Sequence, residues 1–151
     1  MLKHKLVALL PMKAHSERIP RKNFKTFAGK PLFRWILDTL LSIDSVEKVI
    51  INTDAVDLLE KNGVSSDGRV QIRQRSDRLV GDLVSMNRIL EDDIQAIDSQ
   101  LYLMTHNTNP LLQARTIEAA LEYYRIKDCD SLFTVNRYQT RFYRADASPV
   151  N

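Results

Sequence analysis

Positively charged side chains and hydrogen-bond donors concentrate in a short stretch near the start of the chain. The stretch follows the apolar run of residues 6–10 and ends at Asn23. Lysine acts on phosphate as a point charge, and arginine can bind two oxygens at once. The stretch therefore predicts a polyanionic ligand, most simply a nucleoside triphosphate. The residues that can supply charge and donors to phosphate are Lys13, Ser16, Arg18, Lys22 and Asn23.

Two alternatives for this stretch stay open. A loop of this composition can also be a solvated basic segment without a ligand. The stretch has no glycine before Gly29, so it is neither a Walker loop nor a GxGxxG turn. His15 is compatible with a base, a phosphate donor or a spectator.

Two later polar stretches are further candidates. Arg75 and Arg78 precede Asp82 and Ser85, and the bland alternative is surface ion pairs with Asp82 beginning a helix. Residues 106–110 read His-Asn-Thr-Asn-Pro, and asparagine offers both a donor and an acceptor to a base or sugar. The alternative there is a turn before a helix. The candidates from this last stretch are His106, Thr108 and Asn109.

The apolar pattern predicts the elements that must position these residues. Apolar runs and alternation predict strands at 6–10, 46–54, 70–74, 100–105 and 131–135. Spacings of three and four predict helices at 32–43, 55–62, 83–97 and 114–126, with Thr53 or Asp54 capping the second. Alternating strands and helices predict an α/β fold with a mainly parallel sheet. In such sheets, loops at the carboxyl ends of strands bind ligands.

Composition narrows the class of protein. The chain has 151 residues and 44% hydrophobic residues, which suit a single domain over 1–151. The single cysteine, Cys129, excludes an internal disulfide, and no apolar run is long enough for a membrane helix. We therefore expect a cytoplasmic protein with no membrane partner.

The positive charge is local. Residues 1–34 hold nine of the 22 basic residues and only one of the 19 acidic ones. This asymmetry is typical of an anion site. A nucleic-acid surface is the competing interpretation, but no aromatic residues are interleaved with the early cations, so we expect no nucleic-acid partner.

Taken in order, these stretches resemble the acylneuraminate cytidylyltransferase family over nearly the whole chain. Residues 11–23, Pro-Met-Lys-Ala-His-Ser-Glu-Arg-Ile-Pro-Arg-Lys-Asn, are similar to the family's opening loop, and residues 29–32 to its Gly-Lys-Pro-Leu. Residues 51–54 resemble its Val-Ser-Thr-Asp. Residues 75–85 and 105–112 resemble its later Arg-Pro-x-x-Leu-x-x-Asp and Gln-Pro-Thr-Ser-Pro-Leu motifs.

The resemblance implies a fold and a reaction. It implies a Rossmann-like, three-layer α/β/α nucleotidyltransferase fold of the GT-A-like type. It also implies transfer from CTP to a 2-keto acidic sugar such as a sialic acid, giving a CMP-sugar and pyrophosphate. Lys13, Ser16, Lys22 and Asn23 would hold the triphosphate and nucleotide, and Lys13 and Lys22 would be catalytic, with Lys22 most important for rate. Arg75, Ser85 and the loop of residues 106–109 would contact the base or ribose.

The chain departs from the family pattern in places. Lys13 replaces the family's loop arginine, and Glu17 replaces its lysine, with Arg18 beside it. His106 stands where glutamine is usual. The resemblance further implies Mg²⁺, with ligands expected beyond residue 151, and a homodimer in a full-length member. A non-catalytic nucleotide-binding fragment and a related enzyme such as CMP-KDO synthetase remain alternatives.

Overall fold

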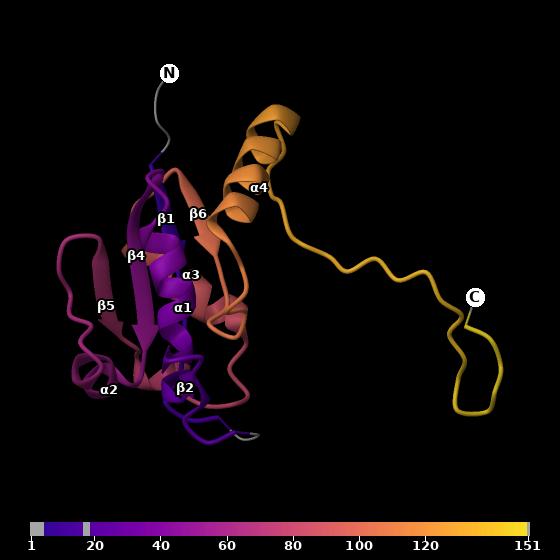
Figure 1. The fold of residues 1–151 in the computed structure, drawn as a ribbon, viewed down its shortest axis with the longest axis horizontal. Coiled ribbons are helices and arrows are strands. Elements are labelled where there is room, and N and C mark those ends of the chain that lie inside the picture. The colour runs from indigo at the N-terminus through magenta and orange to yellow at the C-terminus, as the bar shows by residue number, and fades with distance from the viewer. Residues whose placement is uncertain (1–4, 17–18, 151) are drawn as a thin grey trace. The chain divides into compact units, whose positions relative to one another are not determined.

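The computed structural model describes residues 5–16 and 19–150 of the chain (Figure 1). They divide into two compact units, Met1–Glu118 and Ala119–Asn151, with the boundary inside helix α4 (Ala114–Lys127). The prediction of one domain therefore stays a prediction. Within the described residues, no helix has the length and apolar character needed to span a membrane.

The first unit is built on a four-stranded parallel sheet. The strands are β1 (Leu6–Leu9), β4 (Val46–Thr53), β5 (Val70–Gln74) and β6 (Leu101–Met104). They lie in the order β5-β4-β1-β6, and all three pairings are parallel. The predicted parallel sheet is thus confirmed. All of β1 is buried, as expected for a central strand covered on both faces.

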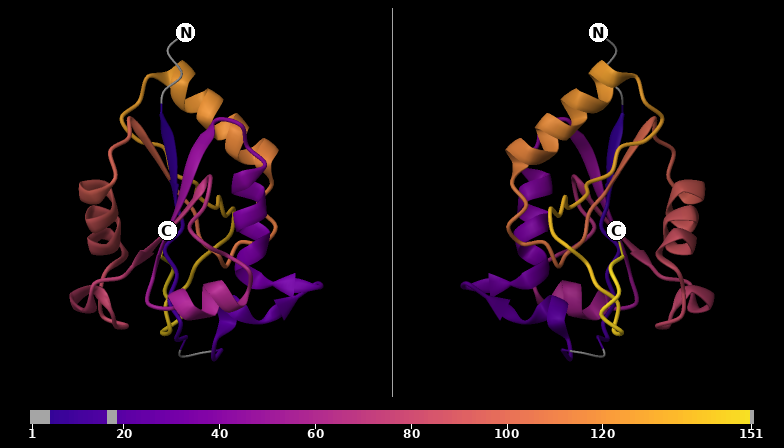
Figure 2. Two further views of the ribbon diagram at one scale, coloured as in Figure 1. Left: turned by 90° about the vertical axis from the view of Figure 1, so that its left-hand side faces the viewer. Right: turned by 90° about the vertical axis from the view of Figure 1, so that its right-hand side faces the viewer.

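Helices cover both faces of this sheet. Helix α1 (Leu32–Leu41) lies on one face and α3 (Met86–Ala96) on the other (Figure 2). Along α1, Phe33, Ile36, Leu37 and Leu40 follow the helical spacing and are fully buried. Burial of each such side chain contributes about 1.5–3 kcal/mol. On the face covered by α3, Leu90 and Ile97 pack against Val7, Leu9 and Ile50 of the sheet.

A small hairpin connects the basic stretch to α1. A single 3₁₀ turn, η1 (Lys22–Phe24), precedes β2 (Thr26–Phe27), which pairs antiparallel with β3 (Lys30–Pro31). The two turn residues have positive φ, 47° at Ala28 and 91° at Gly29. The Trp35 indole donates to the Phe27 carbonyl at 2.8 Å and so fixes the hairpin against α1.

The predicted cap of the short helix α2 (Val56–Lys61) is wrong. Ala55 occupies the N-cap position, and no side chain caps the helix. The reason is that both predicted caps are engaged elsewhere. The Thr53 hydroxyl accepts from the Ala55 amide, and the Asp54 carboxylate accepts from the Ala14 amide at 2.7 Å.

Two other predictions need correction. Helix α3 begins at Met86, with Ser85 as N-cap, so Asp82 does not begin it, and Leu83 is fully exposed. Residues 82–83 form a turn before the helix, and Asp82 pairs with Lys13. A second 3₁₀ turn, η2 (Asp77–Leu79), precedes it.

The predicted strand at 131–135 does not form. Phe133 and Val135 are exposed, and within the described residues no strand pairs with this segment. Strand propensity depends on a partner that satisfies the backbone. The second unit instead closes a loop between Phe142 and Val150, where the Val150 amide donates to the Phe142 carbonyl at 2.9 Å.

Candidate active site

A pocket of about 210 Å³ lies in the first unit, where polar loops follow the carboxyl ends of β1, β5 and β6. This is the position at which open parallel sheets bind ligands. Three groups of residues form its wall. The loop after β1 gives Pro11, Met12, Lys13, His15, Ser16, Lys22 and Asn23. The segment after β5 and helix α3 give Arg75, Gly81, Asp82, Val84, Met86 and Ile89, and the loop after β6 gives His106, Asn107 and Thr108.

Most of the residues singled out from the sequence meet at this pocket. Ser85 and Asn109 do not line it. Arg18 and its neighbour Glu17 lie outside the described residues. The placement brings three separate stretches, spread over residues 11–108, into one wall, but the roles of the residues stay predictions. The predicted site residues that line the pocket are Lys13, Ser16, Lys22, Asn23, Arg75, Asp82, His106 and Thr108.

The loop after β1, described by the structure at residues 11–16 and 19–23 and here called the basic loop, makes contacts on two sides. The Asn23 side-chain amide donates to the Lys13 carbonyl at 2.8 Å, and Asn23 is only 4% exposed. On the other side, the Ala14 amide donates to Asp54, the residue that follows β4. These two contacts hold Lys13, Ala14 and Asn23 in place. The Asn23 side-chain oxygen is buried and has no partner within the described part of the chain.

Lys13 faces an acid across the pocket wall. Its ammonium group forms an ion pair with the Asp82 carboxylate, and both side chains are 40% exposed. At that exposure solvent screens the pair, so it contributes little to stability. The pair places one negative charge among the cations, and Asp82 is the one acidic residue among the described residues that line the pocket.

Arg75 is almost completely buried and tied to the sheet. Its Nε donates to the Asn52 side-chain oxygen at 2.9 Å, and its Nη2 donates to the carbonyls of Met12 at 3.0 Å and Asn52 at 2.8 Å. Burial lowers the pKa of Arg75, and the charges of Asp54 and Asp93 oppose that shift. The hydrogen bonds offset the cost of burying a guanidinium group.

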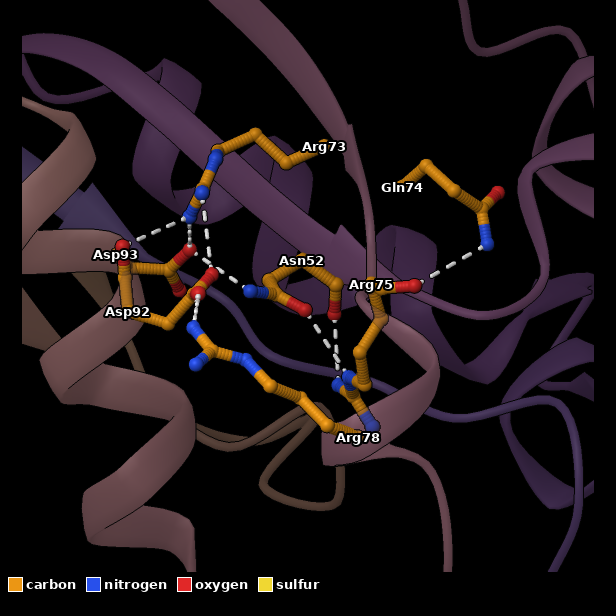
Figure 3. Close-up of polar contacts among 7 residues, drawn as sticks. All are labelled: Asn52, Arg73, Gln74, Arg75, Arg78, Asp92 and Asp93. Atoms are coloured by element: carbon orange, nitrogen blue, oxygen red, sulfur yellow. Dashed lines mark hydrogen bonds and ion pairs between the residues drawn. The ribbon is translucent and has the colours of Figure 1, made fainter.

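Asn52 links Arg75 to a cluster of charges on α3 (Figure 3). Its side-chain nitrogen donates to Asp93 at 2.8 Å, and Asp93 also pairs with Arg73. Asp93 is fully buried, and burial raises its pKa although the bonds from Asn52 and the charge of Arg73 lower it. Asp92 accepts from Arg73 at 3.0 Å and from Arg78 at 3.2 Å.

Two of these residues, Asn52 and Asp93, were missed by sequence reasoning. Asn52 interrupts the apolar run of β4, and Asp93 occupies an apolar position of the stripe formed by Ile89 and Ile97. A polar residue at a core position is the signal that would have found both.

Asn107 belongs to the loop of residues 106–109 that the resemblance implies for the base or ribose. It is 7% exposed, and its side-chain nitrogen has no partner within the described residues.

The wall combines donors with an apolar side. Lys13, Lys22 and Arg75 supply positive charge, and the buried amides of Asn23 and Asn107 offer an acceptor and a donor. Val84, Met86 and Ile89 supply an apolar surface. Phosphate with a flat, partly apolar ring attached fits this combination. Among the described residues, no three His, Cys, Asp or Glu side chains gather as a metal site, so these residues alone do not fit a resident Mg²⁺.

Known proteins share this chain's sequence pattern and fold. A family model described as cytidylyltransferase matches residues 7–150. The pseudaminic acid cytidylyltransferase of Campylobacter jejuni is 26% identical over 149 residues, which cover 93% of this chain and 62% of that protein. The N-acylneuraminate cytidylyltransferase of Streptococcus agalactiae is 23% identical over 138 residues, covering 89% of this chain and 33% of the relative.

A solved structure gives the same fold. The CMP:2-keto-3-deoxy-manno-octonic acid synthetase complexed with CTP has a TM-score of 0.67 and 21% identity, and the match covers 82% of this chain and 48% of that chain. The Rossmann-like α/β nucleotidyltransferase fold expected from the sequence is thus confirmed. The chain spans at most 62% of the length of these proteins.

Proposed function

The chain belongs to the cytidylyltransferase family, and we propose that it transfers the CMP group of CTP to a 2-keto acidic sugar and releases pyrophosphate. The observation that carries the proposal is the pocket in which Lys13, Lys22 and Arg75 come together with two buried amide atoms that lack partners within the described residues, Asn23 Oδ1 and Asn107 Nδ2. Two relatives are named for acidic sugars, pseudaminic acid and an N-acylneuraminate. These names support the substrate class, and the individual sugar is left to experiment.

The proposed reaction is a displacement at phosphorus. The oxygen of the sugar's anomeric hydroxyl group bonds to the α-phosphorus of CTP and loses its proton. The bond from that phosphorus to the bridging oxygen breaks, and pyrophosphate leaves with the electron pair. Catalysis of such a transfer consists mainly of positioning and of stabilising developing charge.

The basic loop has the chemistry for this stabilisation. Lys22 and Lys13 would neutralise the negative charge that grows on pyrophosphate as it leaves. The wall of Val84, Met86 and Ile89 would lie against the nucleoside, where burial of the ring favours binding. The requirement for Mg²⁺ stays a prediction, as does a homodimer.

A binding-only role is the second candidate. It is favoured by the low number of acidic residues in the pocket wall. Asp82, already paired with Lys13, is the one carboxylate among the described residues that line it. A polypeptide with this wall can hold CTP without turning it over. Both candidate functions require binding of CTP, but only the transferase turns CTP over.

An assay of pyrophosphate release separates them. The chain is incubated with CTP, Mg²⁺ and one acidic sugar at a time: N-acetylneuraminic, pseudaminic, legionaminic or 3-deoxy-manno-octulosonic acid. Release that needs both CTP and one of these acids supports the transferase. Saturable CTP binding without release in any mixture supports the binding role, and absence of CTP binding overturns both.

A further inference from the structure

We propose that Asn52 and Asp93, neither of which lines the pocket, are positioning residues that hold the Arg75 guanidinium group in place for the nucleotide. This inference rests on the proposed function, because it assumes that the pocket binds CTP. It concerns how one cation of the pocket is fixed. Figure 3 shows the three side chains in sequence, from Asp93 through Asn52 to Arg75.

Arg75 retains one donor group for a ligand. Its Nε and Nη2 are engaged by Asn52 and by the Met12 carbonyl. Its Nη1 has no hydrogen-bond partner within the described part of the chain, and Arg75 is a pocket residue that is 4% exposed. Nη1 is not one of the buried side-chain atoms that lack a partner, so solvent or a ligand can reach it and accept from it. Nη1 is therefore the donor that the fold leaves for the ligand.

The Asn52 side chain fixes where that donor lies. It is fully buried, and its oxygen accepts from Arg75 Nε. Its backbone carbonyl accepts from Arg75 Nη2 and from the Met12 amide, so one residue holds both the guanidinium group and the start of the basic loop. Two acceptors from the same residue leave the guanidinium plane little freedom to rotate.

Asp93 sets the orientation of the Asn52 amide. Its carboxylate accepts from the amide nitrogen at 2.8 Å, which leaves the amide oxygen toward Arg75. A rotated amide would place its NH₂ group against Arg75 Nε–H and its oxygen against the carboxylate. Both contacts would be repulsive, so Asp93 permits one orientation only.

Asp93 is itself held by groups on two elements. Arg73 of β5 pairs with it, and also donates to the Asp92 carboxylate at 3.0 Å and the Asp92 carbonyl at 3.3 Å. The chain of contacts thus runs from α3 and β5 through Asn52 of β4 to the pocket. A polar cluster that only joined these elements would affect the stability of the fold and would not act on a pocket residue. The proposal is therefore tested by CTP affinity as well as by stability.

The test compares substitutions in the full chain. Asn52→Leu keeps the branching at Cγ but removes both side-chain hydrogen bonds. Asp93→Leu removes the acceptor for Asn52, and Asp93→Asn retains an oxygen acceptor. CTP dissociation constants come from calorimetry, and the mobility of the Arg75 side chain comes from the ¹⁵N NMR signal of its Nε–H group. Arg78→Gln is the matched control, because it breaks only the bond to Asp92, and the Arg78 side chain is 74% exposed.

We expect Asn52→Leu and Asp93→Leu to weaken CTP binding about tenfold, since the loss of a hydrogen bond to a charged group frees the guanidinium. The Arg75 Nε–H signal should lose its protection from exchange in both variants. Asp93→Asn should bind CTP with an affinity within about twofold of that of wild type. The control Arg78→Gln should have the same CTP affinity as wild type.

A double-mutant cycle with Arg75→Lys distinguishes an effect through Arg75 from a general loss of stability. If Asn52 acts through Arg75, Asn52→Leu adds little further loss of CTP affinity in the Arg75→Lys background. Equal losses in both backgrounds, or unchanged affinity in folded Asn52→Leu, overturn the inference alone. A wild-type chain that binds no CTP overturns the proposed function, and with it the positioning of Arg75 for a nucleotide.

Discussion

The Lys13 ammonium group pairs with the Asp82 carboxylate, although the two residues are 69 positions apart in the chain. The pair joins the loop after β1 to the segment before α3, and both residues line the pocket. It also means that Lys13 already has a counter-ion. A triphosphate that binds Lys13 must compete with Asp82 or lie beside it.

Asp82→Asn tests this competition. In the absence of divalent cations, we expect the variant to bind CTP about three- to tenfold more tightly, because a negative charge near the triphosphate is removed. Calorimetry in EDTA measures the change. The matched control is Asp38→Asn, which breaks the Lys30–Asp38 ion pair outside the pocket. Weaker CTP binding in Asp82→Asn would show instead that the carboxylate positions Lys13.

Asn107→Ala should separate ligand binding from stability. The buried side-chain nitrogen of Asn107 has no partner within the described residues, so its removal should leave the free energy of unfolding unchanged or slightly raised. CTP or sugar-acid binding should weaken about five- to tenfold if that nitrogen donates to the ligand. Urea unfolding and calorimetry give the two values.

The control for that experiment is Leu111→Ala, also after β6 but exposed and outside the pocket. It should keep the affinity of wild type. Loss of stability in Asn107→Ala with unchanged affinity would show that the amide serves the fold and does not contact a ligand.

Asp93 should make stability depend on pH. Burial raises the pKa of Asp93 in the folded chain above its unfolded value, so the folded state holds the proton more tightly. The stabilisation that the protonated Asp93 carboxyl gives the folded chain is present below about pH 4. It falls as the pH rises through the raised folded pKa of Asp93. Asp93→Asn lacks this loss.

The measurement for Asp93 is the difference in unfolding free energy between Asp93→Asn and wild type from about pH 4 to pH 7. We expect the variant to gain stability relative to wild type as the pH rises. A relative loss over the same range would mean that the ionised carboxylate, paired with Arg73, is the favoured form in the folded chain.

Ala28→Asn should stabilise the hairpin that leads into α1. Ala28 has φ 47° at the first turn position, a region that costs alanine about 1 kcal/mol and that asparagine tolerates. We expect the free energy of unfolding to rise by about 0.5 kcal/mol, measured by urea denaturation. Ala8→Asn offers no such gain, since Ala8 is buried in β1. A lower stability of Ala28→Asn would show that its side chain matters beyond the turn.

The sequence predicted the parallel sheet and its helices because local periodicity encodes burial. The apolar run of residues 6–10 predicted β1, and the spacing from Leu32 to Leu40 predicted α1. The wrong predictions depend on distant partners. Asp82 pairs with Lys13 and does not begin α3, and Asp54, one of the two expected caps, accepts from the amide of Ala14.

The candidate site was predictable where charge gathers in one stretch. Lys13, Lys22 and Asn23 are neighbours in sequence, and the pocket brings them to Arg75 and His106. Asn52 and Asp93 carry no motif of their own. They are 41 positions apart, and only the packing of α3 on the sheet makes them partners. A single sequence shows that each is a polar residue in an apolar pattern, but it does not show that the two residues are in contact.

We propose that the pocket is a CTP site whose basic loop binds the triphosphate. The most direct test of this proposal is calorimetric titration of the chain and of Lys22→Ala with CTP, ATP, GTP and UTP, with Lys25→Ala as a control outside the pocket. We expect saturable binding with preference for CTP. We also expect binding that is at least about tenfold weaker in Lys22→Ala and unchanged in Lys25→Ala. Equal binding of all four nucleotides, or equal CTP affinity in Lys22→Ala and wild type, would contradict it.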